Sequence, residues 1–537
     1  MSRKIDPITV ELIGNGLNSI VEEMGETLIR AAYSTNIKER RDCSTALFDI
    51  KGRTIVQAEH IPIHLGSFIG AIEAIYEKIP QAQIEEGDTF VGNDAYNGGG
   101  THLPDIVLAT PIFVEKELIA WAVNLAHHAD FVDRAHAHIF QEGLRIPPIR
   151  LYRNFKLQED VMSLILLNCQ VPHERGNDFR AQMAGNRVGI ERFKDLCAKY
   201  GKQLVKNAMN ELLDYAERRM RAGIANIPDG IYEFEDKFDC SEIDGELIFK
   251  IKTKVKGEEI FLDFSDNPKQ VRAGVNMVRT ALLATVYYAV KTVVDPDVLP
   301  NAGLYRPIHV ISEPGSILCA KEPAAVDNRM QSSARVVDLI HGALAKAVPE
   351  RVIAACNGAC VGATYCGINP KTDKFYVYVE TIGGGFGARA TKDGLDGVHV
   401  HTTNTSNLPV EALEPEYPLQ VERYELVKDS GGIGRWRGGM GMRRTIKIEH
   451  ENCHVSVQGS RSLSSPWGLL GGGEGGRFFV NHEGSGGPLV NGQGIFGTGD
   501  RVEVVTPGAG GYGPSSERDL ESIKNDLSDG KISFEVE

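Results

Sequence analysis

Residues that could bind a metal ion are concentrated between positions 94 and 133 of this 537-residue chain. The segment offers carboxylates and imidazoles but no thiol, and four of the chain's 15 histidines fall between His127 and His138. Carboxylate oxygens mixed with imidazole nitrogens suit Mn²⁺, Fe²⁺ or Zn²⁺. The candidate ligands are Asp94, His102, Asp105, His127, His128, Asp130 and Asp133.

The spacing of His102 and Asp105 favours a metal site over unrelated polar residues. The two lie three residues apart with Pro104 stiffening the turn, and the glycines at 98–100 allow a tight bend before them. One strand excursion separates them from His127, which could return beside His102. Two histidines and one aspartate would leave coordination positions open for water or substrate. For any single histidine, a hydrogen-bonded loop residue is the alternative interpretation.

Three further residues lie near predicted functional loops. Asp42 precedes a predicted hairpin and could join the site as a ligand or base; a carboxylate paired with neighbouring arginines is the alternative. His60 and His64 flank Pro62 before a predicted helix. His64 could line the cleft, although spacing alone favours an ordinary helix-entry residue.

Other kinds of catalytic centre are poorly supported by the sequence. There is no GxSxG elbow, and Cys43 has no histidine base near it in the chain. The glycines at 383–387 follow a predicted strand at 374–381 but no helix pattern follows, so a dinucleotide fingerprint is not indicated, and no P-loop pattern occurs. Cys356, Cys360 and Cys366 lack zinc-ribbon spacing, and buried small residues are the favoured interpretation.

Periodicity and turn residues predict the elements that would position the site. Asp6 and Pro7 predict the start of a helix with an apolar stripe from Ile13 to Leu28. Further helices are expected at 67–79, 178–200, 202–224, 276–294 and 332–347. Strands are expected at 45–50, 53–58, 88–92, 106–114, 118–124, 231–238, 247–255, 259–264, 445–449, 454–458, 478–481 and 501–506. The candidate ligands therefore fall at strand ends and in loops, where functional residues are often held.

Length predicts a protein of several domains, and the short strands and glycine-rich turns beyond about residue 400 predict a β-rich C-terminal region. We expect an N-terminal α/β metal-site domain (1–226), a central α+β domain (227–400), a β-rich domain (401–513) and a flexible charged tail (514–537). The net charge of −14 argues against nucleic-acid binding and binding to anionic membranes. The apolar run at 281–290 is too short to cross a bilayer, and no signal-peptide pattern is visible, so we expect a cytoplasmic protein.

Six segments together resemble one known family, the hydantoinase B (HyuB-type) subunits of hydantoinases, oxoprolinases, lactamases and acetone carboxylase relatives. They are ERRDCSTALFD at 39–49, GNDAYNGGGTHLPD at 92–105, AHHAD at 126–130, EGLRIPP at 142–148, DSGGIGRWRGG at 429–439 and TPGAGGYG at 506–513. The segments occur in family order over nearly the whole chain.

The resemblance implies a mixed α+β subunit that works with a HyuA-type subunit holding ATP and Mg²⁺. Such complexes phosphorylate a carbonyl or amide oxygen, then hydrolyse a cyclic amide or carboxylate a ketone. The family's metal ligands match His102, Asp105 and His127, which narrows seven candidates to three. Asp130 or Asp42 would then be the nearest base or a residue that orients a ligand. The chain departs from the family where Phe131-Val132-Asp133 replaces a common Val/Ile-Gly-Gly, and where Ala95 replaces a common proline.

The favoured hypothesis is a metal-containing subunit (Zn, Mn or Fe) of an ATP-dependent cyclic amide hydrolase, acting on a small cyclic amide in a hetero-oligomer such as a heterotetramer. Two alternatives remain open: a subunit of an ATP-dependent ketone carboxylase of the acetone or acetophenone type, and a non-catalytic scaffold for the ATP-binding partner.

Overall fold

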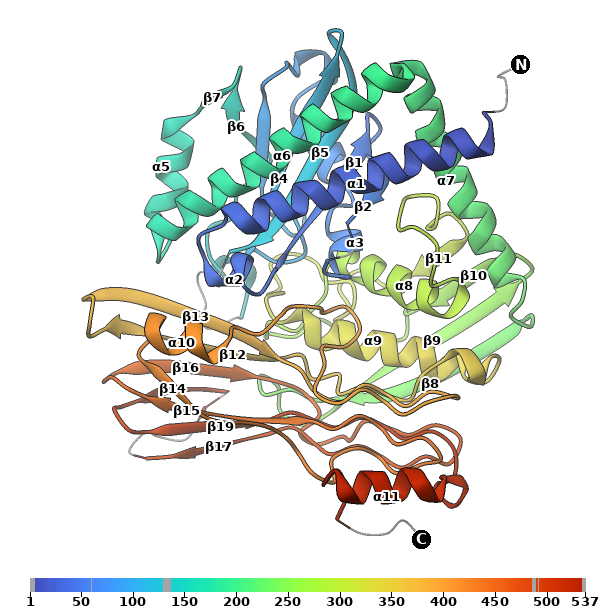
Figure 1. Ribbon diagram of the computed structural model, residues 1–537, viewed down its shortest axis with the longest axis vertical. Helices are drawn as coiled ribbons and strands as arrows, with labels where there is room; N and C mark the ends of the chain where they lie inside the picture. The colour runs from blue at the N-terminus through green and yellow to red at the C-terminus, as the bar shows by residue number, and fades with distance from the viewer. Residues whose placement is uncertain (1–4, 59, 129–136, 485–488, 491, 534–537) are drawn as a thin grey trace.

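The computed structural model describes residues 5–58, 60–128, 137–484, 489–490 and 492–533. It combines helices with four main sheets, which confirms the predicted α+β class. In Figure 1 the N-terminal region is uppermost, helices α8 and α9 lie in the middle, and the C-terminal strands form the lower part.

The N-terminal region is built on a seven-stranded sheet in the order β2-β1-β5-β4-β3-β6-β7, with antiparallel neighbours throughout. The predicted strands around the candidate ligands are confirmed. The strands are β1 (Cys43–Asp49), β2 (Thr54–Gln57), β3 (Thr89–Gly92), β4 (Asp105–Val114), β5 (Glu117–His127), β6 (Ile149–Arg153) and β7 (Lys156–Leu157).

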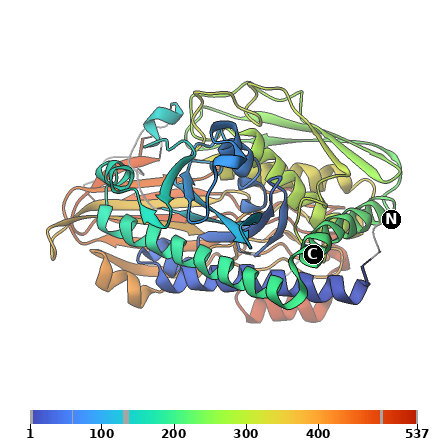
Figure 2. The same ribbon diagram turned by 90° about the horizontal axis from the view of Figure 1, so that it is seen from above.

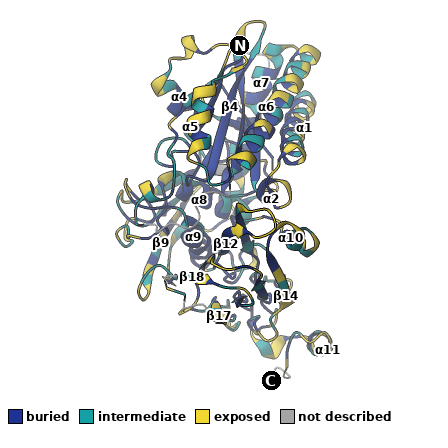
Figure 3. Ribbon diagram, turned by 90° about the vertical axis from the view of Figure 1, so that its left-hand side faces the viewer, coloured by how far each residue is buried: buried dark blue, intermediate teal, exposed yellow. Residues whose placement is uncertain are grey.

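Helices cover both faces of this sheet, and Figure 3 shows β4 buried between them. One face packs against α1 (Pro7–Ala31) and α6 (Pro172–Tyr200), which run side by side in Figures 1 and 2 and are followed by α7 (Lys202–Ile224). Asp6 caps α1 by accepting a hydrogen bond from the backbone N–H of Thr9 (3.1 Å), as predicted. The remaining helices of this region are α2 (Thr35–Lys38), α3 (His64–Ser67), α4 (Ala71–Lys78) and α5 (Glu159–Leu167), with short 3₁₀ turns at η1 (Gln81–Gln83) and η2 (Ile139–Gln141).

A buried amide network fixes α6 to the strands that carry the candidate ligands. Asn124 Nδ2 of β5 donates to the Gln182 carbonyl and to Asn186 Oδ1, both at 2.7 Å. Gln182 Nε2 in turn donates to the backbone carbonyl of Ile106 in β4 (2.8 Å). Because all three amides are fully buried, each of these hydrogen bonds avoids a desolvation cost of about 1–3 kcal/mol. The ends of β4 and β5 are therefore held rigidly.

The central region pairs a smaller sheet with two helices. The sheet has the order β11-β10-β9-β8, and its last three strands confirm the predicted meander. Helix α9 packs on β8 and β9, and α8 packs on α9. The elements are β8 (Gly230–Phe238), β9 (Leu247–Lys256), β10 (Glu259–Asp263), β11 (Ile308–Ile311), α8 (Arg279–Val294), α9 (Arg329–Leu344) and η3 (Pro349–Arg351).

The C-terminal region contains two four-stranded antiparallel sheets that share one apolar core. The first is β13 (Lys374–Ile382), β12 (Val361–Asn369), β16 (Cys453–Gln458) and β18 (Gln493–Phe496). The second is β14 (Leu419–Leu426), β15 (Met442–Ile448), β19 (Arg501–Val505) and β17 (Phe479–Glu483). The short helix α10 (Val410–Glu416) precedes β14. The predicted β-rich character of this region is confirmed.

Two expected elements differ in the structure. The helix expected at 67–79 forms only as α4, over 71–78, and it is separated from α3, which ends at Ser67, by Gly70, whose φ of +85° cannot continue a right-handed helix. The segment expected to be a flexible charged tail after Gly513 contains η4 (Ser515–Glu517) and α11 (Leu520–Ser528). Its charges pair with the body of the protein, since Arg518 binds Asp393 (2.8 Å) and Asp526, and Ile523 is buried.

None of the helices in the described part of the chain combines the length and the apolar character that a bilayer-spanning segment needs.

Candidate metal centre

The β4–β5 hairpin places Asp105 and His127 opposite each other. Asp105 is the first residue of β4 and His127 is the last residue of β5, and the two are Cα partners in the antiparallel register. His102 lies in the turn that leads into β4. Gly100 in this turn has a φ of +77°, and a Cβ there would lie 2.7 Å from the Cβ of Asp105. The glycine therefore permits the close turn that brings His102 over Asp105.

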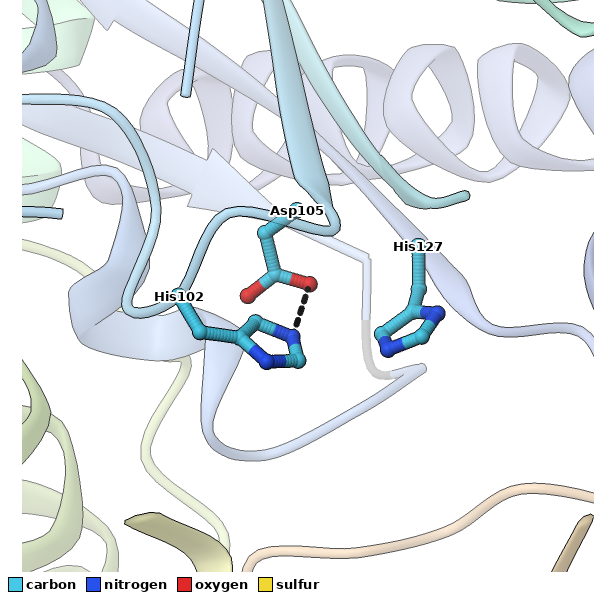
Figure 4. Close-up of side chains that lie close together, drawn as sticks. All are labelled: His102, Asp105 and His127. Carbon is cyan, nitrogen blue, oxygen red and sulfur yellow. Dashed lines mark ion pairs between the residues drawn. The ribbon is translucent and has the colours of Figure 1, made fainter. Parts of the chain in front are cut away.

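The three side chains converge on one point, as Figure 4 shows. His102 Nε2 lies 3.2 Å from Asp105 Oδ1, and the rings of His102 and His127 have centroids 4.9 Å apart. One potential ligand atom from each residue lies within 4.8 Å of those of the other two. The predicted set of His102, Asp105 and His127 is thus brought together by the fold.

His102 Nε2 and Asp105 Oδ1 face each other as an ion pair at 3.2 Å, and neither has a further hydrogen-bond partner among the described residues. Their side chains are 4% and 0% exposed, so water does not readily compensate them. A buried contact of this kind needs a positive charge between the two atoms, because a lone pair on Nε2 would otherwise face the carboxylate. A divalent cation between an imidazole nitrogen and a carboxylate oxygen would satisfy both, so the residues present fit a metal ion.

The charge states of Asp105 and His127 also suit a cation. Burial acts to raise the pKa of Asp105, but the attraction of His102 and Arg329 outweighs it, and the pKa lies well below its ordinary value. Burial lowers the pKa of His127 to about 3, so its imidazole is neutral. An ionised carboxylate and a neutral imidazole are the forms that coordinate metals.

A proton and a metal ion would compete for the Nε2 atom of His102. Burial and Arg329 act to lower the pKa of His102, but Asp105 and Asp327 outweigh them and raise it. The carboxylate therefore attracts a positive charge to Nε2, which either a proton or a metal ion can supply. Metal binding would release that proton and would strengthen as the pH rises.

The outer nitrogen of His127 has a partner that bears on this assignment. Asn36 Nδ2 donates to the His127 carbonyl oxygen (2.7 Å) and lies 3.1 Å from its Nδ1, while Asn36 Oδ1 accepts from Arg40. An amide that donates to Nδ1 places the ring proton on Nε2. Metal binding through Nε2 would displace this proton, so His127 fits the ligand role less completely than His102 does.

Asp42, predicted as a base or ligand, lies at the edge of the same group. It directly precedes β1, and its backbone carbonyl accepts a hydrogen bond from the His127 N–H (3.0 Å). Burial raises the pKa of Asp42, opposed by His64 and Arg40. A carboxyl group with a raised pKa is better suited to proton transfer near neutral pH than an ordinary aspartate. Asp130, the other predicted base, lies outside the described residues, as does Asp133.

The remaining sequence candidates belong elsewhere. Asp94 forms a bidentate ion pair with Arg145 (2.9 and 3.0 Å). His128 follows His127 on the chain but points to the opposite side, where its Nε2 lies 3.1 Å from Gln182 Oε1 and its ring packs on Phe179. Both are structural residues.

The structure adds residues that sequence patterns leave out of the site. His64, for which the sequence indicates at most a place in the cleft wall, is buried; its Nε2 lies 4.0 Å from Asp105 Oδ1, and its Nδ1 is 2.8 Å from Ser44 Oγ. Arg329 Nη2 donates to Asp105 Oδ2 at 3.1 Å. Arg329 carries no local signal, because it comes from a segment 224 residues further along the chain.

A cavity of about 720 Å³ opens onto this group. Asp42, His64, His102, Asp105 and His127 line one end of it. The opposite wall comes from the C-terminal sheet, with Thr364, Val379, Ser456 and Ile495 contributed by β12, β13, β16 and β18. The candidate centre is therefore accessible to a small molecule, although His102 and Asp105 are almost fully buried and His127 is half-buried.

A second group, Asp338, Cys356 and His401, has similar geometry but a different environment. Asp338 Oδ1 lies 2.9 Å from His401 Nε2, and its Oδ2 accepts from Arg461 (2.8 Å). Cys356 Sγ accepts from the Gly387 N–H (3.2 Å). These atoms are already paired and do not line the cavity, so this cluster is a closed hydrogen-bonded network.

The sequence of this chain matches one known protein family over most of its length. Residues 6–515 match the family model described as hydantoinase B/oxoprolinase, and the chain belongs to that family. This confirms the resemblance found in the sequence.

Two relatives of this chain are named as subunits of a hydantoinase and of a caprolactamase. The chain is 31% identical to a Pseudomonas protein named as the B component of a putative D-/L-hydantoinase, over 99% of this chain and 94% of that protein. It is also 31% identical to the beta chain of the caprolactamase of Pseudomonas jessenii, over 99% and 95% of the two chains. The crystal structure of the ATP-dependent caprolactamase from that organism superposes with a TM-score of 0.88, covering 99% of this chain and 96% of that chain at 28% identity.

The fold is shared more widely. The nucleotide-free structure of an acetone carboxylase superposes with a TM-score of 0.90 over 99% of this chain and 78% of that chain, at 18% identity. This match concerns the fold alone.

Proposed function

We propose that this chain is the metal-containing subunit of an ATP-dependent cyclic amide hydrolase. The substrate would be a small cyclic amide such as a hydantoin, an oxoproline or a lactam. A HyuA-type partner subunit would transfer a phosphoryl group from ATP to its carbonyl oxygen. Water would then add to the carbonyl carbon in the cavity next to the candidate centre, the C–N bond would break, and inorganic phosphate would be released. The observation that carries the proposal is the buried contact between His102 Nε2 and Asp105 Oδ1, whose residues line a cavity large enough for such a substrate.

In this proposal His102, Asp105 and His127 hold a zinc, manganese or iron ion. A bound ion of this kind supplies Lewis acidity and lowers the pKa of a water molecule. Asp105 is ionised and His127 is neutral, which are the charge states that a metal ion needs, and binding through His127 Nε2 would also move its ring proton to Nδ1.

Asp42 would act as the general base that accepts a proton from the attacking water. Its position beside His127 and its raised pKa suit a group that takes a proton during attack and returns it to the leaving nitrogen. His64, anchored by Ser44, stands beside Asp105 and would orient a polar group in the cavity through Nε2. Asp130 is the alternative base that the sequence suggested.

ATP would bind to another chain. The sequence contains no P-loop pattern, and two of the relatives are named as subunits of their enzymes. We propose a hetero-oligomer with a HyuA-type subunit that holds ATP and Mg²⁺, such as a heterotetramer. We also propose a cytoplasmic location, which is supported by nine cysteines that form no disulfide bond within the described part of the chain.

The test is a reconstituted complex of this chain with its co-purifying partner. Lactams, hydantoins, oxoproline and ketones would be supplied with and without ATP, and ring opening measured by mass spectrometry. We expect ATP-dependent opening of a cyclic amide that is lost in His102→Ala and retained in Asp195→Asn, an exposed acidic residue on α6.

Other outcomes would identify the alternatives. Bicarbonate-dependent ATP turnover with a ketone would replace the hydrolase by a carboxylase. Unchanged activity in His102→Ala would leave only a scaffold role for this chain.

A further inference from the structure

The atoms of the candidate centre are oriented by a chain segment that belongs to a different region. Residues 327–329 lead into α9, more than two hundred residues beyond His102 and Asp105 in the sequence. Two side chains of the centre contact this segment directly, and each contact acts on the atom that does not face the metal position.

Arg329 acts on Asp105. Its Nη2 donates to Asp105 Oδ2 (3.1 Å), and its Nε donates to Thr101 Oγ1 (2.8 Å). Thr101 Oγ1 donates to the same Oδ2 (3.3 Å). One carboxylate oxygen is thus engaged by two donors, while Oδ1 is left to face His102. The carboxylate cannot rotate to present Oδ2 without breaking both contacts.

Asp327 acts on His102. Its backbone carbonyl oxygen lies 3.2 Å from His102 Nδ1, and its carboxylate Oδ1 lies 3.4 Å from the same nitrogen. An oxygen acceptor at Nδ1 requires a ring proton there, which leaves Nε2 as the nitrogen that can offer a lone pair to a metal. Partners that fix a tautomer in this way are the usual support of metal-bound histidines.

The segment is itself held from two sides. Glu142 of the N-terminal region accepts through Oε1 from the backbone N–H of Asp327 (3.0 Å), and Asn328 N–H donates to the Gly274 carbonyl of the central region (2.9 Å). The contacts therefore form a bridge between the sheet that carries the ligands and the start of α9.

We infer that Asp327 and Arg329 are positioning residues for the metal centre, and that metal binding is coupled to the packing of the start of α9 against β4. This inference rests on the proposed function, because it assumes that His102 and Asp105 bind a metal ion. If the ion stabilises the arrangement, then the arrangement must equally strengthen binding of the ion, since coupling is reciprocal.

An ordinary buried ion pair would stabilise the fold but would not affect the metal. The chain offers a matched control: Arg335 is a second buried arginine of α9, and it lies 3.5 Å from Asp236, outside the centre. Arg329→Lys and Arg329→Gln are compared with Arg335→Lys in the full-length chain. Dissociation constants for Zn²⁺ and Mn²⁺ are measured by competition with a chromophoric chelator, and thermal unfolding is recorded with and without the ions.

We expect Arg329→Gln to weaken metal binding by about 10–100-fold, with Arg329→Lys intermediate. Arg335→Lys should lower the unfolding temperature without changing the metal dissociation constant. In the wild type, metal should slow amide exchange in the peptide covering 326–332. If Arg329→Gln does not fold, Thr101→Val removes the second donor to Asp105 and should weaken binding in the same direction.

The outcomes distinguish the positioning role of Arg329 from the existence of the metal centre. Wild-type affinity in both Arg329→Gln and Thr101→Val, or in Thr101→Val alone if Arg329→Gln does not fold, would overturn the positioning role and leave the metal site intact. A wild-type chain that binds neither Zn²⁺ nor Mn²⁺ would overturn this inference together with the proposed metal centre.

Discussion

His102 Nε2 and Asp105 Oδ1 form an ion pair at 3.2 Å in the protein interior, and neither has another hydrogen-bond partner among the described residues. The carboxylate is held from its other side by Arg329, and the imidazole by Asp327. His102 Nε2 and Asp105 Oδ1 therefore face each other because the other polar atom of each side chain, Nδ1 or Oδ2, is already engaged. Such an arrangement is costly without a cation and favourable with one.

Asp42 should be needed for turnover but not for metal binding. Because Asp42→Asn removes a proton acceptor and leaves His102, Asp105 and His127 in place, we expect kcat of the reconstituted complex to fall by about 10²–10⁴-fold. Metal content, measured by elemental analysis, should stay at the wild-type level. Near-normal kcat in this variant would move the role of base to another residue, with Asp130 the first to test.

Gly100 should be required both for the backbone turn that leads into β4 and for metal binding at the candidate centre. Gly100→Ala strains a backbone with φ +77° and places a Cβ 2.7 Å from Asp105 Cβ. Gly257 is a matched control, since its φ is +59° and a Cβ there meets nothing within 4 Å. We expect both variants to lose about 1–3 kcal/mol of stability in urea unfolding, from backbone strain.

Only Gly100→Ala should also weaken Zn²⁺ binding, because only that variant displaces Asp105. Equal Zn²⁺ affinity in the two glycine variants would show that the turn does not determine the position of the carboxylate.

The closed cluster of Asp338, Cys356 and His401 should make stability depend on pH. Burial alone would lower the pKa of His401, but Cys356 and Asp338 outweigh it and raise the pKa from 6.5 to about 10. A raised folded-state pKa contributes stability that is full below the unfolded value and is lost as the pH rises. The stability difference between wild type and His401→Gln should therefore shrink between pH 6.5 and about 10.

Chemical unfolding across that pH range measures this difference. A constant difference would contradict a charged His401 in the folded protein.

Local sequence patterns were sufficient for the elements that carry the ligands. The strands β4 and β5 and the Asp6 cap follow from alternation, apolar runs and capping residues, which act over a few neighbouring residues. Apolar periodicity extends the helix expected at 67–79 across Gly70, because it does not register the left-handed φ of that residue. The local charge pattern indicates a flexible tail after Gly513, because the partners of those charges, such as Asp393, lie far away in the chain.

Local sequence patterns also predict only part of the candidate metal centre. Spacing indicated His102, Asp105 and His127 among seven candidates, and the family resemblance selected them. Spacing could not show which of His127 and His128 faces the site, because strand alternation assigns neighbouring residues to opposite faces without saying which face is functional. Nothing local connects Arg329 or Asp327 to residues more than two hundred positions earlier, so these contacts depend on the tertiary fold.

Elemental analysis of the purified chain tests most directly whether His102 and Asp105 hold a metal ion. Wild type, His102→Ala and Asp105→Ala would be compared with His454→Ala, a histidine that lines the same cavity away from the centre. We predict about one divalent ion per wild-type and His454→Ala chain, and loss of that ion in the other two variants. Full metal content in folded His102→Ala and Asp105→Ala would contradict the account.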